Sequence, residues 1–324
     1  MGDSHHQPLK MGQACVSVDL DGLRCYRDIH GLSAPRAQLN GGQGADAAYS
    51  IGVRRLLDFF DAERLPATLF VIGRDLEVDA HSSLLLEAHE AGHELANHSY
   101  SHHYDLRTRP LAEQEREIAR CEEAILELTG RKPTGFRTPG YNVDASLLAI
   151  CRSRGYLYDS SIFACPPYYL AKGAVMSWLS LRGRPSRSQM TRPQTLLAPL
   201  APYFPDEKRF WRDSQRGYGL LEMPMAVVPG VRFPIIGTSL HLLKELGFDA
   251  VYPLIRRAQP RHFNLEFHAI DFMDSNDEGV ADLVGIQPDL AVPWTTKRAR
   301  YAHVFARLRE HYRFATLEDT ARSF

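Results

Sequence analysis

Apolar and polar positions along this chain form blocks that predict buried strands alternating with amphipathic helices. Short apolar runs predict strands at 15–18, 67–72, 93–96, 135–137 and 156–158. Apolar residues at helical spacing predict helices over 50–60, 84–91, 110–128, 144–154 and 297–311, and regular apolar segments return at 220–225 and 263–268. Residues 23–49 are rich in Gly and polar residues, which predicts a loop.

This repeated alternation implies a parallel sheet or barrel whose functional groups gather at the carboxyl ends of the strands. Residues 164–218 break the pattern, because Pro and Arg are frequent there and aromatic residues are scattered without a period. We expect an insertion over the mouth of the barrel, either a lid that shapes the substrate site or a surface excursion with its own small core. Residues 1–13 are expected to be a polar tail, and 14–324 a single catalytic domain.

Polar residues with metal-binding chemistry follow two of the predicted strands. Asp19 and Asp21 come at the end of the first apolar run, and His98 and His102 follow the run at 93–96. Two His at i and i+4 share a face if the backbone there is helical, and with one carboxylate they form a three-ligand catalytic zinc site. The second carboxylate could act as a general base, so this arrangement predicts hydrolysis. Alternatively, the histidines are ordinary solvated residues and the Asp-Gly sequence is ordinary turn chemistry.

The overall charge gives no support to two kinds of partner. The 324 residues carry a formal net charge of −1 and are 44% hydrophobic, so no electrostatic argument favours nucleic acid or an anionic membrane. A local cluster of arginines within the insertion could face an anionic or phosphate-bearing ligand, or could be a solvated loop. Its members are Arg182, Arg184, Arg187 and Arg192.

The five cysteines are widely spaced and form no CxxC pair, so the sequence favours neither a disulfide scaffold nor a zinc ribbon. The first ten residues contain no apolar segment of the signal-peptide type, and no later run reaches 18 apolar residues. We therefore expect a cytoplasmic protein, with Met1 or Met11 as the start.

Six short motifs, taken in order, resemble those of the polysaccharide deacetylases with a NodB homology domain, carbohydrate esterase family 4, in the branch with a DxD first motif. The resemblance covers residues 14 to 320 and implies a distorted parallel (β/α) barrel. Gly140 stands where many members have an aromatic residue. The motifs are Ser17-Val18-Asp19-Leu20-Asp21-Gly22, His98-Ser99-Tyr100-Ser101-His102, Arg137-Thr138-Pro139, Asp159-Ser160-Ser161, Glu222-Met223-Pro224 and Phe267-His268.

The resemblance implies a role for each matched residue. Asp21, His98 and His102 would hold a divalent metal, most plausibly Zn²⁺. Asp19 would be the base that deprotonates the metal-bound water, and His268 the acid that protonates the leaving amine. The remaining implied roles are the orientation of Asp19 by Arg137 and oxyanion stabilisation by a backbone N–H near Gly140.

Some residues have competing roles. Asp159 or Asp271 could orient His268, with Asp159 favoured because the resemblance covers it. Tyr141 could line the sugar site or belong to the core, and Glu222 could support the site or the fold. His93 is expected to pack within its strand, and His103 to be solvated or to lie behind the metal ligands.

The implied function is metal-dependent removal of an N-acyl group, most plausibly acetyl, from an amino sugar. The substrate would be a saccharide, a nucleotide sugar or a lipid-linked glycan precursor, with peripheral membrane contact as an option for the last. Alternatives are a deformylase or a non-sugar amidase on the same fold, or an inactive carbohydrate-binding relative.

Overall fold

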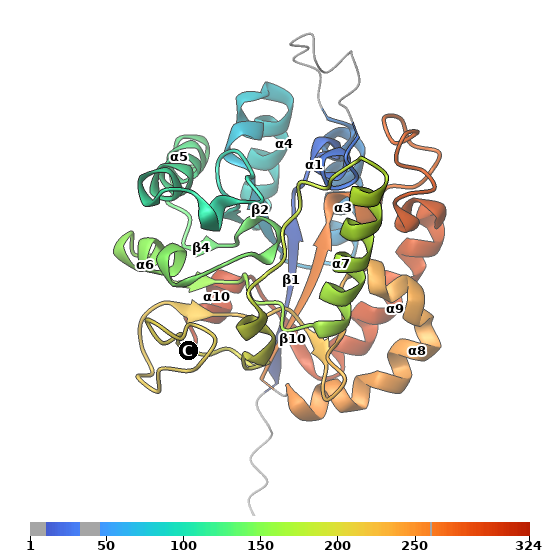
Figure 1. The fold of residues 1–324 in the computed structure, drawn as a ribbon. Helices are drawn as coiled ribbons and strands as arrows, with labels where there is room; N and C mark the ends of the chain where they lie inside the picture. Colours follow the sequence, from blue (N-terminus) through green and yellow to red (C-terminus); the bar gives the residue numbers. More distant parts are fainter. Residues whose placement is uncertain (1–10, 33–45, 260) are drawn as a thin grey trace, which may run out of the picture.

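The computed structural model describes residues 11–32, 46–259 and 261–324 of the chain (Figure 1). Its strands are β1 (Gly12–Asp19), β2 (Thr68–Val71), β3 (Glu94–Asn97), β4 (Gly135–Phe136), β5 (Tyr158–Asp159), β6 (Leu221–Glu222), β7 (Val227–Val228), β8 (Phe233–Pro234), β9 (His262–His268) and β10 (Tyr312–Phe314). Its α-helices are α1 (Leu23–Ile29), α3 (Arg54–Ala62), α4 (Asp79–Glu90), α5 (Leu111–Thr129), α6 (Ala145–Ser153), α7 (Pro166–Leu181), α8 (Gly237–Ala258), α9 (Trp294–Arg309) and α10 (Leu317–Ala321).

Eight strands form one parallel sheet, in the order β10-β1-β2-β3-β4-β5-β6, with β9 also paired to β1. Strand β9 pairs with β1 along residues 13–19 of β1. On the other side of β1, β10 pairs with its start and β2 with its end. The sheet curls into a half-barrel with helices outside it (Figure 1). The fold confirms the predicted parallel (β/α) barrel in distorted form.

Strands β1 and β9 have an apolar outer face and a partly polar inner face. In β9, Phe263, Leu265 and Phe267 belong to the large core under the helices, whereas the alternate residues Asn264 and Glu266 point the other way. In β1, Val16 and Val18 likewise face the helices. Since both faces are buried, the polar residues inside must find partners there.

A small apolar cluster fills the half-barrel below these polar residues. Cys15, Phe70, Tyr158 and Met223 pack together, and Leu317 from α10 joins them. All five cysteines of the chain are buried free thiols. The lower end is therefore closed, and the polar groups above it are confined to the carboxyl ends of the strands.

Four helices differ from the sequence expectation, and one of them is α10, in a segment where no helix was predicted. Helix α1 lies within the predicted loop 23–49, of which the structure describes 23–32 and 46–49. Helix α7 lies in the predicted irregular insertion. Its own apolar residues occur on all sides of the helix, so the sequence has no amphipathic pattern that would predict it. Helix α8 was not predicted; Pro253 lies inside it, and it is kinked at Lys244, whose φ is 54°. No helix in the described ranges is long and apolar enough to cross a membrane.

Candidate active site

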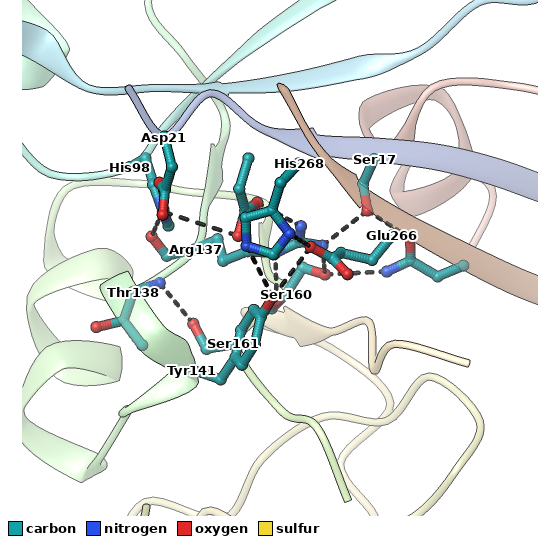
Figure 2. A network of polar contacts seen from close by, with 12 residues as sticks. Ser17, Asp21, His98, Arg137, Thr138, Tyr141, Ser160, Ser161, Glu266 and His268 are labelled. Carbon is teal, nitrogen blue, oxygen red and sulfur yellow. Dashed lines mark hydrogen bonds and ion pairs between the residues drawn. The ribbon is translucent and has the colours of Figure 1, made fainter. Parts of the chain in front are cut away.

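The predicted site residues meet at the carboxyl ends of the parallel strands (Figure 2). Asp19 ends β1 in register with His268 at the end of β9, and Asp21 follows in the turn after β1. His98 comes directly after β3, and Arg137 directly after β4. Residues far apart in the sequence are thus brought together because each one ends a strand of the same parallel sheet.

Three buried side chains converge with atoms that lack a partner. The Asp21 Oδ1 atom lies 3.0 Å from Nε2 of His102 and 3.5 Å from Nε2 of His98. None of these three atoms has a hydrogen-bond partner within the part of the chain that the structure describes. Buried polar atoms left unpaired destabilise a fold, whereas a cation would satisfy all three together. One carboxylate and two imidazoles form a donor set that fits a divalent metal and suits zinc.

The surroundings prepare these groups as ligands. Nδ1 of His98 donates to the carbonyl oxygen of Arg137 at 2.7 Å, which leaves the Nε2 lone pair free. Burial would raise the pKa of Asp21, but His102 and His98 hold it well below its usual range, so the carboxylate is ionised. Burial also lowers the pKa of both imidazoles; Asp19 reverses this at His98, whereas the pKa of His102 stays lowered.

The segment that carries the two imidazoles is a loop, so the helical geometry expected for it is wrong. Ser99 and His102 have φ values of 63° and 56°, in the left-handed region. The backbone N–H of Ser99 donates to Asn97, and the N–H of His102 donates to the hydroxyl of Ser99. Two left-handed residues in a short loop turn both rings toward Asp21 without a helix.

Asp19 is held by a buried guanidinium. Nη1 of Arg137 donates to Asp19 Oδ1 at 2.6 Å, and its other nitrogens donate to Ser17 and to the hydroxyl and carbonyl oxygens of Ser160. The guanidinium also lies 4.1 Å from the ring centre of Phe70. Burial disfavours the charged guanidinium, but Asp19 more than offsets this and raises the pKa of Arg137. These contacts fix the carboxylate of Asp19 in one orientation.

His268 belongs to a second polar cluster beside Asp19. Its Nδ1 lies 2.9 Å from Oε1 of Glu266, and the Tyr141 hydroxyl lies 3.0 Å from that oxygen and 3.3 Å from Nε2 of His268 (Figure 2). Burial alone would lower the pKa of His268, but Glu266, and then Asp19, raise it well above its usual value. The protonated imidazole of His268 can act as a general acid, and the fixed carboxylate of Asp19 beside it can act as a general base.

Comparison with known proteins finds a similarity to polysaccharide deacetylases over part of the chain. A family model described as polysaccharide deacetylase matches residues 45–158. A peptidoglycan deacetylase of Helicobacter pylori is 32% identical over 159 residues, which are 48% of this chain and 52% of that protein. The part of the chain from residue 45 to residue 158 is therefore similar to the polysaccharide deacetylases.

Two solved structures have a similar fold over nearly the whole chain. A structure described as a polysaccharide deacetylase from Mycobacterium smegmatis superposes with a TM-score of 0.57 at 19% identity, over 98% of this chain and 91% of the other. A PuuE allantoinase superposes with a TM-score of 0.58 at 16% identity, with the same coverage. Both likenesses concern the fold. The chain spans about half of the curated relative it matches, and the matched family region contains the two imidazoles and Arg137 but neither β1 nor β9.

Glu266 is a residue of this candidate site that the sequence analysis missed. It precedes His268 by two positions on a strand, so both side chains leave the same face of β9. Its fully buried carboxylate is bonded by the ring of His268 and the hydroxyl of Tyr141. The period-two pattern of polar residues in 263–268 is the signal that could have found it.

Asp159 does not orient the ring of His268; Glu266 does. The carboxylate of Asp159 accepts the N–H and hydroxyl of Ser161, at 3.0 and 2.8 Å, and that hydroxyl oxygen accepts the N–H of Thr138. Asp159 ends a different strand, β5, and its contacts point to the segment after Arg137. It therefore positions the Arg137 segment.

Asp271 and Glu222 also support the backbone of the site. Asp271 accepts the backbone N–H of His268 at 2.8 Å, so it fixes the main chain and leaves the ring to Glu266. Glu222 accepts the N–H of Ile162 at 3.0 Å, and burial, followed by Asp159, raises the pKa of its carboxyl well above the usual range. Glu222 therefore has a structural role.

Gly140 and Tyr141 form a left-handed turn at the mouth of the site, with φ values of 62° and 60°. A Cβ atom on Gly140 would lie 3.1 Å from the ring of Tyr104, so both conformation and space favour glycine here. The N–H of Tyr141 donates to the carbonyl of Thr138, which leaves the N–H of Gly140 as the candidate oxyanion donor. The hydroxyl of Tyr141 bonds to the Glu266–His268 pair, so its ring lies within the site.

The two histidines that flank the metal-binding segment have other contacts. His93 is buried, and its Nδ1 lies 3.2 Å from the N–H of Ala67, a contact beside β3. His103 is partly exposed, with its Nε2 3.8 Å from Glu117. Neither belongs to the converging group around Asp21.

Proposed function

We propose that this protein is a metal-dependent N-deacetylase that acts on an amino sugar. The observation that supports this most directly is that Asp19 and His268, which can transfer protons, lie beside the three unpaired ligand atoms of Asp21, His98 and His102. Asp19 Oδ2 lies 3.8 Å from Nε2 of His98, and Asp19 and His268 come within 4.8 Å of each other through their ligand atoms. Such a site has a base and an acid at the point where an amide would bind.

Asp21, His98 and His102 would hold the metal, for which zinc is the proposed ion. When bound, a divalent cation polarises the amide carbonyl and lowers the pKa of a coordinated water. The protein's own residues perform the proton transfers. Asp19, held by Arg137, accepts a proton from the attacking water.

His268 supplies the second proton. As the C–N bond breaks, its imidazolium donates a proton to the departing nitrogen, so the amino sugar leaves as an amine and the acyl group as a carboxylic acid. Glu266 keeps His268 protonated until this step. The N–H of Gly140 is placed to stabilise negative charge on the amide oxygen.

The substrate class is part of the proposal. Relatives are named as peptidoglycan and chitin deacetylases, which supports an N-acetylated saccharide as substrate here. Nucleotide sugars and lipid-linked glycan precursors are included because we also propose a cytoplasmic location. Fractionation of cells that express the full chain would test the location separately.

An acetate-release assay tests the activity. Zinc-loaded protein should release acetate from at least one of a panel of chitooligosaccharides, peptidoglycan, nucleotide sugars and lipid-linked saccharides. Chelation should abolish the activity and added zinc restore it, and Asp19→Asn should retain zinc while losing at least about a hundredfold in kcat. Acetate release by Asp19→Asn at the wild-type rate would refute the base assignment. Turnover of formamides or of allantoin, without release of acetate from any sugar, would refute the substrate class.

A further inference from the structure

The inserted helix α7 brings a cation to the mouth of the site. The ring of Tyr168, in the first turn of α7, lies 6.1 Å from the ring of Tyr141. One turn later, Nζ of Lys172 lies 3.9 Å from the position that a Cβ atom on Gly140 would occupy. The same position lies 3.1 Å from the ring of Tyr104, which packs on the ligand His102 with 4.8 Å between ring centres. Lys172 therefore faces the turn that carries the candidate oxyanion donor.

This ammonium group has no counter-ion in the described ranges. Its contacts are with the faces of Tyr168 and Tyr169, whose ring centres lie 5.9 and 5.8 Å from Nζ. Lys172 is only partly exposed, and burial lowers its pKa to about 8 with no carboxylate to oppose the shift. The rings partly compensate for lost hydration, but a cation–π contact does not neutralise the charge.

Lys297 shows how this chain treats a lysine when the role is structural. Its buried Nζ donates to the carbonyl oxygen of Met273 at 2.7 Å, and Asp271 and Asp289 oppose in part the lowering of its pKa by burial. The difference between the two lysines is the surrounding charge. At Lys172, no carboxylate of the described ranges takes this place.

We propose that Lys172 is a substrate-binding residue that pairs with an anionic group on the sugar carbon next to the N-acyl group. This inference rests on the proposed function, since it assumes that the amide binds at Asp21, His98 and His102. On a 2-acetamido sugar, the neighbouring carbons are C1 and C3. A phosphate on C1 and a carboxylate on the O3 substituent are the two forms of this chemistry, and each would provide the missing counter-ion.

A matched set of substrates tests the proposal. Acetate release is measured for methyl N-acetylglucosaminide, N-acetylglucosamine 1-phosphate and N-acetylmuramic acid, with wild-type protein, Lys172→Met and Lys172→Arg. We expect Lys172→Met to lose about ten- to a hundredfold in kcat/KM on an anionic substrate, mainly through KM, and less than about twofold on the neutral glycoside. Lys172→Arg should retain most of the preference for the anion. The anionic substrate that wild type prefers identifies phosphate or carboxylate as the group.

Two results would overturn the inference. One is an equal loss on neutral and anionic substrates, and the other is no change on any of them. Calorimetric binding of the three sugars to zinc-loaded Asp19→Asn, with and without Lys172→Met, separates this inference from the proposed activity. Suppose that Asp19→Asn binds the anionic sugars more tightly, that Lys172→Met removes this preference, and that the wild-type protein releases no acetate. This result would support the anion site and refute the deacetylase. If the wild-type protein releases acetate but binding shows no preference for the anionic sugars, the deacetylase is supported and the anion site is refuted.

Discussion

At the scale of single residues, the protonation of His268 depends on its neighbour in the strand. Glu266 is fully buried, and its Oε1 lies 2.9 Å from His268 Nδ1. Burial lowers the pKa of the His268 imidazole, and the charge of Glu266 makes the largest contribution to raising it. The general acid must be protonated to act, so activity should fall as pH rises through the raised pKa of His268.

Removing that charge should move the alkaline limb of activity. In Glu266→Gln the imidazole loses its carboxylate partner, so its pKa falls and the alkaline limb of kcat/KM should shift to lower pH by about one to two units. The measurement is the pH profile of acetate release with zinc held at saturation.

A buried carboxyl that lies elsewhere provides the control for this shift. Glu222 bonds to the N–H of Ile162, and the raised pKa of its carboxyl favours the neutral form that Gln imitates. Glu222→Gln should therefore leave the alkaline limb in place. If both variants shifted the limb equally, a direct effect of Glu266 on His268 would be excluded.

At the scale of elements, the metal-binding loop depends on a contact from helix α5. Glu117 accepts the N–H of Ser101 at 2.7 Å and its hydroxyl at 2.9 Å. These bonds support a segment whose left-handed residues Ser99 and His102 are unfavourable for side chains with a Cβ atom. The carboxylate thus stabilises the loop geometry that aims both imidazoles at Asp21.

Loss of this support should appear in metal affinity. Glu117→Ala should weaken zinc binding by about ten- to a hundredfold, as is typical when a contact that orients the ligands is removed. The measurement is a competition titration with a chromophoric chelator.

Glu113→Ala is the matched control on the same helix. Glu113 pairs with Arg109 on the surface of α5, away from the loop, so its removal should leave zinc affinity unchanged. Thermal unfolding of both metal-free variants checks that each is folded. Equal zinc affinity in the two variants would mean that the loop does not need Glu117.

At the scale of the whole molecule, one buried imidazole should couple the stability of the fold to pH. His262 begins β9, both of its ring nitrogens lack a hydrogen-bond partner among the residues with described positions, and burial lowers its pKa to about 3. Between pH 6.5 and about 3 the unfolded chain binds a proton here that the folded chain does not. Its contribution to stability is therefore fully present above pH 6.5 and is lost as pH falls.

Replacing this residue should flatten the acid side of the stability curve. Relative to His262→Leu, the free energy of unfolding of the wild type should fall by up to about 1.4 kcal/mol per pH unit below pH 6.5. Denaturant titrations from pH 5 to 8 on metal-free protein give this difference directly. Parallel curves for the two proteins over this range would show that His262 does not titrate as its burial requires.

Residue pattern alone determined the strand–helix alternation, a parallel sheet or barrel, and the chemical types gathered at the carboxyl ends of its strands; the barrel itself was implied by the family resemblance. Buried parallel strands have a recognisable apolar pattern, and their carboxyl ends share one edge whatever lies between them. Only the tertiary structure decided that Tyr141 bonds to Glu266 beside His268, that Glu117 supports the loop and that Lys172 has no counter-ion among the described residues. These features depend on contacts between elements distant in sequence, such as Tyr141 with Glu266, which lie 125 positions apart. A single sequence records the types of such residues, but packing determines which of them meet.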